Sequence, residues 1–173
     1  SIIEKGSVIA SGGSATIEEV GLLNYIKTHS EEYTFIDRSI AKNEEEKRQI
    51  HAKAILSDYY LMSTNAFTMD GQLVNIDGNG NRVSALCYGP KHVVIITGMN
   101  KLTPSVEDAY KRIRQDACPP NCVRLGLPTP CSKTGVCGDC MSASSICDLF
   151  VTTRMSRYPD RIHIIMVGEE LGY

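Results

Sequence analysis

Six of the seven cysteines of this chain lie between Cys118 and Cys147. Within this segment, Cys137 and Cys140 are separated by two residues, a gap that lets two thiolates bind one metal ion. An iron–sulfur cluster uses the same thiolate chemistry, and thiol redox chemistry is a competing interpretation. A mixture of free thiols and one disulfide is the structural alternative. We expect zinc or an iron–sulfur cluster on four cysteines, with two more available: Cys131, Cys137, Cys140 and Cys147, then Cys118 and Cys122.

A second group with chemical potential follows the predicted first strand, residues 7–10. Gly12 and Gly13 let the backbone approach a ligand closely, and the helix expected next points free N–H groups and its positive dipole end at that ligand. Ser14 and Thr16 add hydroxyl groups, although Thr16 and Glu19 also have the spacing of a helix capping box. The pattern predicts a site for a phosphate or carboxylate, and its alternative is a plain strand-to-helix turn.

Three further polar loops follow predicted strands, at residues 37–38, 63–65 and 98–101. The carboxyl ends of parallel strands meet at one edge of a sheet, where α/β proteins bind ligands. Asp70 and Lys101 are the catalytic candidates. Asp70 is the candidate acid/base group, and Lys101 is a cation that could neutralise the anion expected at the Gly-rich loop. Asp70 also has the Asp-Gly context of a turn. The expected ligand-binding residues are Gly12, Gly13, Ser14, Thr16, Asn65, Asn81, Arg82 and Lys101.

Apolar runs at residues 7–10, 33–36, 59–62, 93–97 and 161–167 predict strands that alternate with helices. The helices are expected to begin at Thr16, at Asn43 and at Thr103-Pro104. This alternation predicts a three-layer α/β domain with a mostly parallel sheet.

Two turn signals, Asp70-Gly71 and the segment 77–80, predict an inserted β-hairpin made of residues 72–76 and 83–88, with Cys87 in the core. The four prolines between residues 119 and 130 predict a largely irregular Cys-rich loop over 118–147, with a helix over 142–149.

Composition excludes several classes of protein. The 173 residues are 42% hydrophobic, enough for the core of one domain spanning 1–173, and this excludes a disordered chain. A net charge of −2 gives no field for nucleic acid, and no apolar run is long enough for a bilayer. Clustered cysteines and the absence of a secretory signal favour the cytoplasm. Because the chain begins at Ser1 without Met and soon enters a strand, we expect further residues upstream.

Several motifs together resemble the LUD-domain family of lactate-utilisation-type proteins, closest to its cysteine-bearing branch. They are Gly12-Gly13-Ser14-x-Thr16, the run from Asn65 to Val83, Gly89-Pro90-Lys91, Gly98-x-Asn100-Lys101, Pro130-Cys131-x-x-Thr134-Gly135-x-Cys137-x-x-Cys140 and Gly168–Tyr173. The resemblance implies the fold of ribose-5-phosphate isomerase, glucosamine-6-phosphate deaminase and CoA transferases, in which the Gly-rich first loop holds a phosphate. It also implies N-terminal helices upstream of the first strand, which this chain lacks.

These observations leave two functions open. The first is a metabolite- or metal-binding subunit associated with the oxidation of lactate or another organic acid, working with iron–sulfur partner subunits. The second is an isomerase or group transferase acting on a small phosphorylated or carboxylic metabolite. In both cases we expect a small anionic ligand and a homodimer, with neither nucleic acid nor membrane as a partner.

Overall fold

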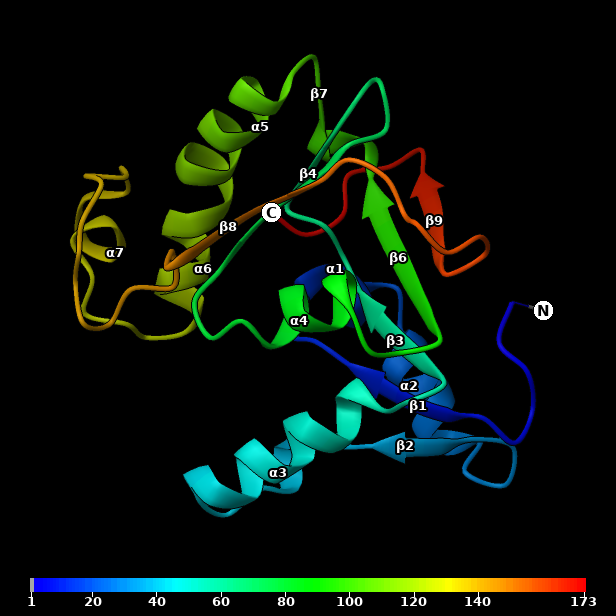
Figure 1. Ribbon diagram of the computed structural model, residues 1–173. Coiled ribbons are helices and arrows are strands. Elements are labelled where there is room, and N and C mark those ends of the chain that lie inside the picture. Colours follow the sequence, from blue (N-terminus) through cyan, green and yellow to red (C-terminus); the bar gives the residue numbers. More distant parts are fainter. Residues whose placement is uncertain (1) are drawn as a thin grey trace.

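Five parallel strands form the main sheet of the protein, in a computed structural model that describes residues 2–173 (Figure 1). Across the sheet, the order is β2-β1-β3-β6-β9, and every neighbouring pair is parallel. The strands are β1 (Val8–Ser11), β2 (Thr34–Ile36), β3 (Tyr59–Met62), β6 (His92–Gly98) and β9 (Ile162–Val167). All five predicted strands of this sheet are therefore present.

A second sheet of four strands stands beside the first, in the order β7-β4-β5-β8. Its strands are β4 (Ala66–Thr68), β5 (Leu73–Asp77), β7 (Leu102–Thr103) and β8 (Leu149–Thr153). β5 pairs antiparallel with β4 and β8, whereas β4 pairs parallel with β7. The fold is thus α/β with a mostly parallel central sheet, as predicted, and it carries a second, mixed sheet.

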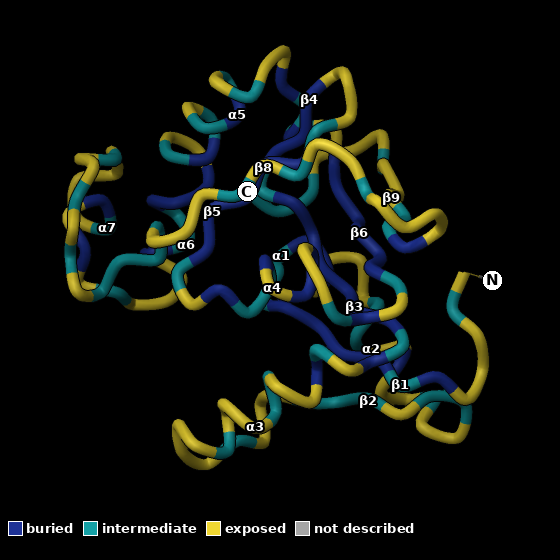
Figure 2. The backbone as a smooth tube through the Cα atoms, viewed as in Figure 1, coloured by how far each residue is buried: buried dark blue, intermediate teal, exposed yellow. Residues whose placement is uncertain are grey.

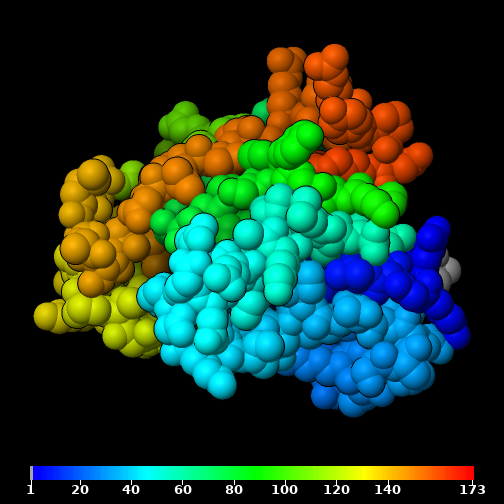
Figure 3. Space-filling view, turned by 60° about the horizontal axis from the view of Figure 1, so that its bottom comes forward, coloured from blue at the N-terminus to red at the C-terminus, as the bar shows by residue number. Residues whose placement is uncertain are grey.

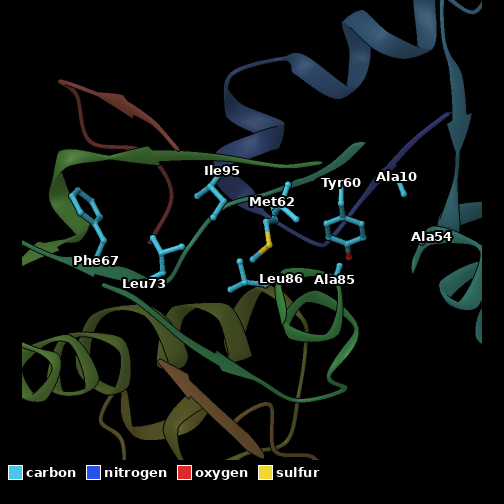
Figure 4. Close-up of a cluster of buried hydrophobic side chains, with 10 residues drawn as sticks. Ala10, Ala54, Tyr60, Met62, Phe67, Leu73, Ala85, Leu86 and Ile95 are labelled. Carbon is cyan, nitrogen blue, oxygen red and sulfur yellow. The ribbon is translucent and has the colours of Figure 1, made fainter. Parts of the chain in front are cut away.

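Helices cover both faces of the main sheet because its strands are apolar on both sides. In β3, Tyr59 and Leu61 pack toward α2, whereas Tyr60 and Met62 pack toward α3 and α4, since successive side chains alternate in direction. Figure 4 shows the second of these clusters, and Figure 2 shows the buried course of the central strands β1, β3 and β6, whereas β2 and β9 at the sheet edges are partly exposed. These helices are α1 (Ala15–Glu19) and α2 (Leu22–Thr28) on one face, α3 (Glu44–Ile55) and α4 (Asn81–Cys87) on the other.

The remaining helices accompany the second sheet. Ala109 of α5 and Cys118 of α6 pack with Ala66 and Val74 of that sheet in one buried cluster. In the space-filling view, the segment that contains α6 and α7 lies at one side of the molecule, in yellow to orange (Figure 3). The elements are α5 (Val106–Arg112), the π-helical turn η3 (Ile113–Ala117), α6 (Cys118–Arg124), α7 (Pro130–Thr134), and the 3-10 turns η1 (Arg38–Ile40) and η2 (Met99–Lys101).

The predicted pairing of residues 72–76 with 83–88 is wrong, because residues 81–87 form helix α4. The Asp77 carboxylate accepts hydrogen bonds from the backbone N–H groups of Gly80 and Val83, and Gly80 adopts φ +81°, so the chain turns directly into a helix. The hairpin forms instead between β4 and β5, across the predicted Asp70-Gly71 turn. Cys87 consequently lies exposed at the end of α4 and not in the core.

The Cys-rich segment is more regular than its prolines suggested. Pro130 stands in the first turn of α7, where a missing N–H costs no helical hydrogen bond. Pro119 stands in the first turn of α6, directly after the π-helical turn η3 that joins α6 to α5 without a break. The helix expected over 142–149 is absent from the described chain, and the strand β8 begins at Leu149 instead, pairing with β5.

Two helix starts also differ from the sequence prediction, while one is confirmed. Ser14, and not Thr16, caps α1, and Gly21 separates α1 from α2. Ser105 caps α5 in place of Thr103. Asn43 caps α3 as expected, accepting from the backbone N–H of Glu46. In the part of the chain that the structure describes, no helix has the length and apolar character needed to cross a membrane.

Arg161 joins the beginning of β9 to the end of α4. Its buried guanidinium donates to the carbonyl oxygens of Ala85 and Leu86 at 2.7 Å and of Pro90 at 3.2 Å. We expect Arg161→Met to lower the free energy of unfolding by about 2–4 kcal/mol, because it leaves buried carbonyls without donors. Urea denaturation measures this. The exposed Arg157→Met is the control, and equal losses in both variants would contradict the assignment.

Candidate anion-binding site

A pocket of about 250 Å³ lies where the carboxyl ends of β1 and β3 meet the second sheet. The main sheet contributes Gly13 to Thr16 and Ser63 to Asn65, which follow β1 and β3. The second sheet contributes Ile76 to Gly78, and α6 contributes Asn121 and Arg124. The polar loops that were expected to meet at this edge do meet there.

The Gly-rich loop presents backbone donors to this pocket. Gly12 N–H continues the ladder to β3 by donating to Leu61 O at 3.0 Å, and the Ser14 hydroxyl accepts from Ile17 N–H. Among residues 2–173, no group accepts a hydrogen bond from the N–H of Gly13 or Ser14, and both residues line the pocket. Unpaired amides at a helix start are suited to an anion.

Lys101 is the central cation of the site. Its side chain is buried, and Nζ donates to Thr16 Oγ1 at 2.8 Å and to Ser63 Oγ at 3.1 Å. Within the described chain, no carboxylate lies within 4.0 Å of this ammonium. Burial, followed by the charges of Arg112 and Arg82, lowers the pKa of Lys101 to about 8. An ammonium with three donors and two hydroxyl partners retains one donor for a ligand.

Arg82 lines the pocket and is held in place by several hydrogen bonds. Its guanidinium already donates to four oxygens at 2.9–3.3 Å, and Nε lies 3.4 Å from the Asp77 carboxylate. The side chain therefore holds β5, α4 and the loop after β3 together while adding its charge to the pocket. The four acceptors belong to Ser63, Asn65, Asn75 and Ile76.

Two further arginines line the pocket and were not among the predicted site residues. The Arg38 guanidinium lies against Gly13, with Nη2 only 2.7 Å from the position that a Cβ atom would occupy there. Arg124 approaches from α6 and donates to Asn121 Oδ1. The lining residues thus carry four cationic side chains and the single carboxylate of Asp77. This excess of positive charge favours an anionic ligand.

Most predicted site residues are brought together, and one is not. Gly13, Ser14, Thr16, Asn65, Asn81, Arg82 and Lys101 line the pocket, and Gly12 lies behind it against Arg82. Asp70 is absent from the lining and stands exposed in the β4–β5 turn. Hydrogen bonds from Thr68 and Gln72 lower the pKa of Asp70, which gives it the character of a turn residue and leaves Lys101 as the catalytic candidate.

The C-terminal residues complete the wall beside the Gly-rich loop. Asn100 accepts from Leu171 N–H and donates to Gly172 O, while Gly172 N–H donates to Glu19 Oε2 at 2.7 Å. These contacts place Tyr173 in the lining of the pocket. Within the motif Gly98-x-Asn100-Lys101, Lys101 therefore supplies the buried ammonium, and Asn100 holds the C-terminal residues 171–173 beside it.

The cysteines do not assemble the expected four-thiolate group. Cys147 lies 3.4 Å from Cys118, sulfur to sulfur, whereas the Cys131 sulfur lies 3.3 Å from Thr129 Oγ1. Within residues 2–173, no three His, Cys, Asp or Glu side chains are arranged to hold a metal ion. Zinc and iron–sulfur clusters need about four converging ligands, so the arrangement of these side chains fits neither group.

A family model described as the LUD domain matches residues 1–167. The chain belongs to the LUD domain family. A search of the curated proteins gives no match. Among solved structures, the LUD protein is similar to a DUF162 family protein from Deinococcus radiodurans, with 12% identity, a TM-score of 0.39, and coverage of 94% of this chain and 88% of that chain.

Gly12 allows Arg82 to pass close to the backbone of this LUD protein. A Cβ atom at Gly12 would lie 2.6 Å from Arg82 Cγ, and the guanidinium beyond it is fixed by its hydrogen bonds. We expect Gly12→Ala to cost about 1–3 kcal/mol of stability in urea denaturation, because the side chain must shift. Gly138→Ala is the control, since no atom lies within 4 Å of its Cβ position. An unchanged midpoint for Gly12→Ala would contradict this packing.

The buried ammonium of Lys101 makes stability depend on pH. The folded pKa of about 8 lies below the ordinary value of 10.5, so the unfolded chain binds more protons between these values. The free energy of unfolding of the wild type should therefore rise with pH in this window, relative to Lys101→Met. Urea denaturation across the window measures the difference between the two proteins, which cancels the titration of other groups. Parallel pH profiles would refute the lowered pKa.

Proposed function

We propose that this LUD protein binds a small metabolite carrying a carboxylate or phosphate in the pocket between its two sheets. The observation that carries the proposal is Lys101, which is 4% exposed and has hydroxyl partners only. Burying an ammonium without a compensating charge is costly, and a bound anion removes that cost. The positive charges of Arg38 and Arg124, which line the same pocket, would also attract this anion.

The backbone donors and the volume of the pocket narrow the ligand class. The free N–H groups of Gly13 and Ser14 suit the oxygens of a carboxylate or phosphate. A volume of about 250 Å³ lies just below the usual range of small-molecule sites, ~300–1,000 Å³. This volume favours a metabolite of a few carbon atoms over a dinucleotide.

Within this class, we propose lactate or a related organic acid as the first ligand to test, and a small sugar phosphate as the second. Membership of the LUD domain family supports an association with lactate oxidation. In this proposal the protein is a cytoplasmic, homodimeric binding subunit that works beside iron–sulfur partner subunits.

A second candidate function is catalysis of isomerisation or group transfer at the same anionic ligand. The observation that favours it is the position of the Lys101 amine, which is buried and lines the pocket. Burial lowers its pKa to about 8, a range that suits proton transfer near neutral pH. Lys101 Nζ faces the pocket beside the Thr16 and Ser63 hydroxyls, so proton transfer to a bound carbonyl compound is chemically feasible.

Calorimetric titration tests the binding proposal, with sulfate, lactate and a sugar phosphate as separate probes. We expect the wild type to bind at least one probe and Lys101→Met to bind it about tenfold to hundredfold more weakly, the cost of losing one charge-assisted hydrogen bond. Lys53→Met, at an exposed position on α3, is the matched control and should bind like the wild type. Equal affinity in all three proteins would overturn the proposal.

The affinity for sulfate, whose charge is constant in this range, should fall as the pH rises through about 8. A bound anion stabilises the protonated amine and raises the pKa of Lys101, so binding takes up a proton when the free amine is partly neutral. Titration in buffers of different ionisation enthalpy measures this uptake. Lys101→Met should show neither the pH dependence nor the uptake, and their persistence in that variant would assign them to another group.

A further inference from the structure

Two cysteines from distant parts of the sequence meet in the wall of the pocket. Cys118 stands in the first turn of α6 and lines the pocket, and Cys147 follows Ile146, which also lines it. Their sulfur atoms are 3.4 Å apart. Figure 1 shows the chain between them extending around α7 before it returns to β8.

The backbone fixes both partners. Cys118 is 6% exposed and belongs to the buried cluster formed with β5 and α5. Cys147 is partly exposed, and its N–H donates to Ser145 Oγ at 2.9 Å. The preceding residue, Ile146, lies so close to Gly78 that a Cβ atom there would be 2.8 Å from Ile146 Cα. The thiols are thus held in contact by packing on both sides.

We propose that Cys118 and Cys147 form a thiol–disulfide redox pair, in which the accessible Cys147 attacks and the buried Cys118 resolves. A disulfide requires the sulfur atoms to approach to about 2.05 Å. The two sulfur atoms start from a separation of 3.4 Å, in direct contact.

The local electrostatics assign the two roles. The hydrogen bond between the two sulfur atoms lowers the pKa of Cys147 to about 7, and the charge of Arg114 acts in the same direction, against burial and Asp148. The same hydrogen bond, followed by burial, raises the pKa of Cys118. Near neutral pH, Cys147 is therefore the sulfur with substantial thiolate character, and thiolates are the attacking species.

The oxidant that we name is a low-molecular-weight disulfide such as glutathione disulfide. The Cys147 thiolate attacks one sulfur of it, forming a mixed disulfide and releasing one glutathione thiolate. The Cys118 sulfur then loses its proton to water and attacks the Cys147 sulfur, which releases the second glutathione. The protein pair gives up two electrons and two protons, and glutathione disulfide becomes two glutathione molecules.

Oxidation of the fully reduced chain by glutathione disulfide, followed by non-reducing proteolysis and mass spectrometry, tests the pair. We expect a peptide linking Cys118 to Cys147, with the loss of two hydrogen atoms from the intact protein. Cys118→Ser should accumulate glutathione on Cys147, because the resolving thiol is missing. Cys147→Ser should leave Cys118 unmodified, and Cys87→Ser, which changes an exposed cysteine outside the segment, should form the same linkage as the wild type.

Other linkages would overturn the proposal. It fails if Cys118 and Cys147 stay reduced while other cysteines, such as Cys137 and Cys140, become linked. It also fails if Cys118→Ser carries no glutathione on Cys147. Should either serine variant not fold, timed alkylation of the wild type decides: Cys147 must react with iodoacetamide faster than Cys118. None of these readouts depends on the ligand of the pocket.

Discussion

The buried ammonium of Lys101 is the constraint on which the rest of the site depends. Its two hydrogen bonds reach Thr16 in α1 and Ser63 after β3, so one side chain joins the ends of three neighbouring strands. A charge in this position is tolerated only if the surrounding dipoles are fixed, because mobile or missing partners would leave it unsolvated. The geometry of the Gly-rich loop, the polar loop after β3 and the turn after β6 follows from this requirement.

Two arginines meet this requirement on the side of the second sheet. Arg112 of α5 donates to the carbonyl oxygens of Asn65 and Asn100, and Arg82 ties Asn65 to β5. Both guanidiniums bind backbone or amide oxygens in several directions, which only the planar fork of arginine allows. They attach the second sheet to the carboxyl edge of the first, and their charges make the pocket more positive. The hydrogen bonds of Arg82 and Arg112 therefore hold the walls of the pocket together, and the two guanidinium charges make its electrostatic potential positive.

Close packing at this edge has a consequence for the cysteines. Pro119 and Pro120 start α6 next to the pocket, and the strand β8 must return past that helix to pair with β5. The return places Cys147 against Cys118, although the two are far apart in the chain. Cys122 lies near this pair and interacts with Cys131, so several cysteines of the segment are neighbours, although no three His, Cys, Asp or Glu side chains of the described residues are arranged to hold a metal ion.

The sequence by itself determined the main sheet and the loops at its carboxyl edge. Runs such as Val93–Thr97 are apolar without interruption, and only a strand covered on both faces buries them. The sequence pattern therefore places Gly12 and Gly13 after β1, and Lys101 after β6, at one edge of the sheet. Local signals also predicted the turn at Asp70-Gly71 and the cap at Asn43, because each depends on neighbours within a few residues, although the hairpin itself was predicted between the wrong segments.

The tertiary structure alone decided the elements and roles that depend on distant partners. Val83 and Leu86 are three residues apart and suit either a strand or a helix, and the Asp77 carboxylate, with the sheet beneath, selects the helix. Arg38 comes from a loop that was expected at this edge, whereas Arg124 enters the site from α6, a segment whose local pattern shows no binding role. The same holds for the sulfur contact between Cys118 and Cys147. Sequence spacing specifies which side chains share a strand or helix face, whereas burial, pKa and contact are properties of the packed chain.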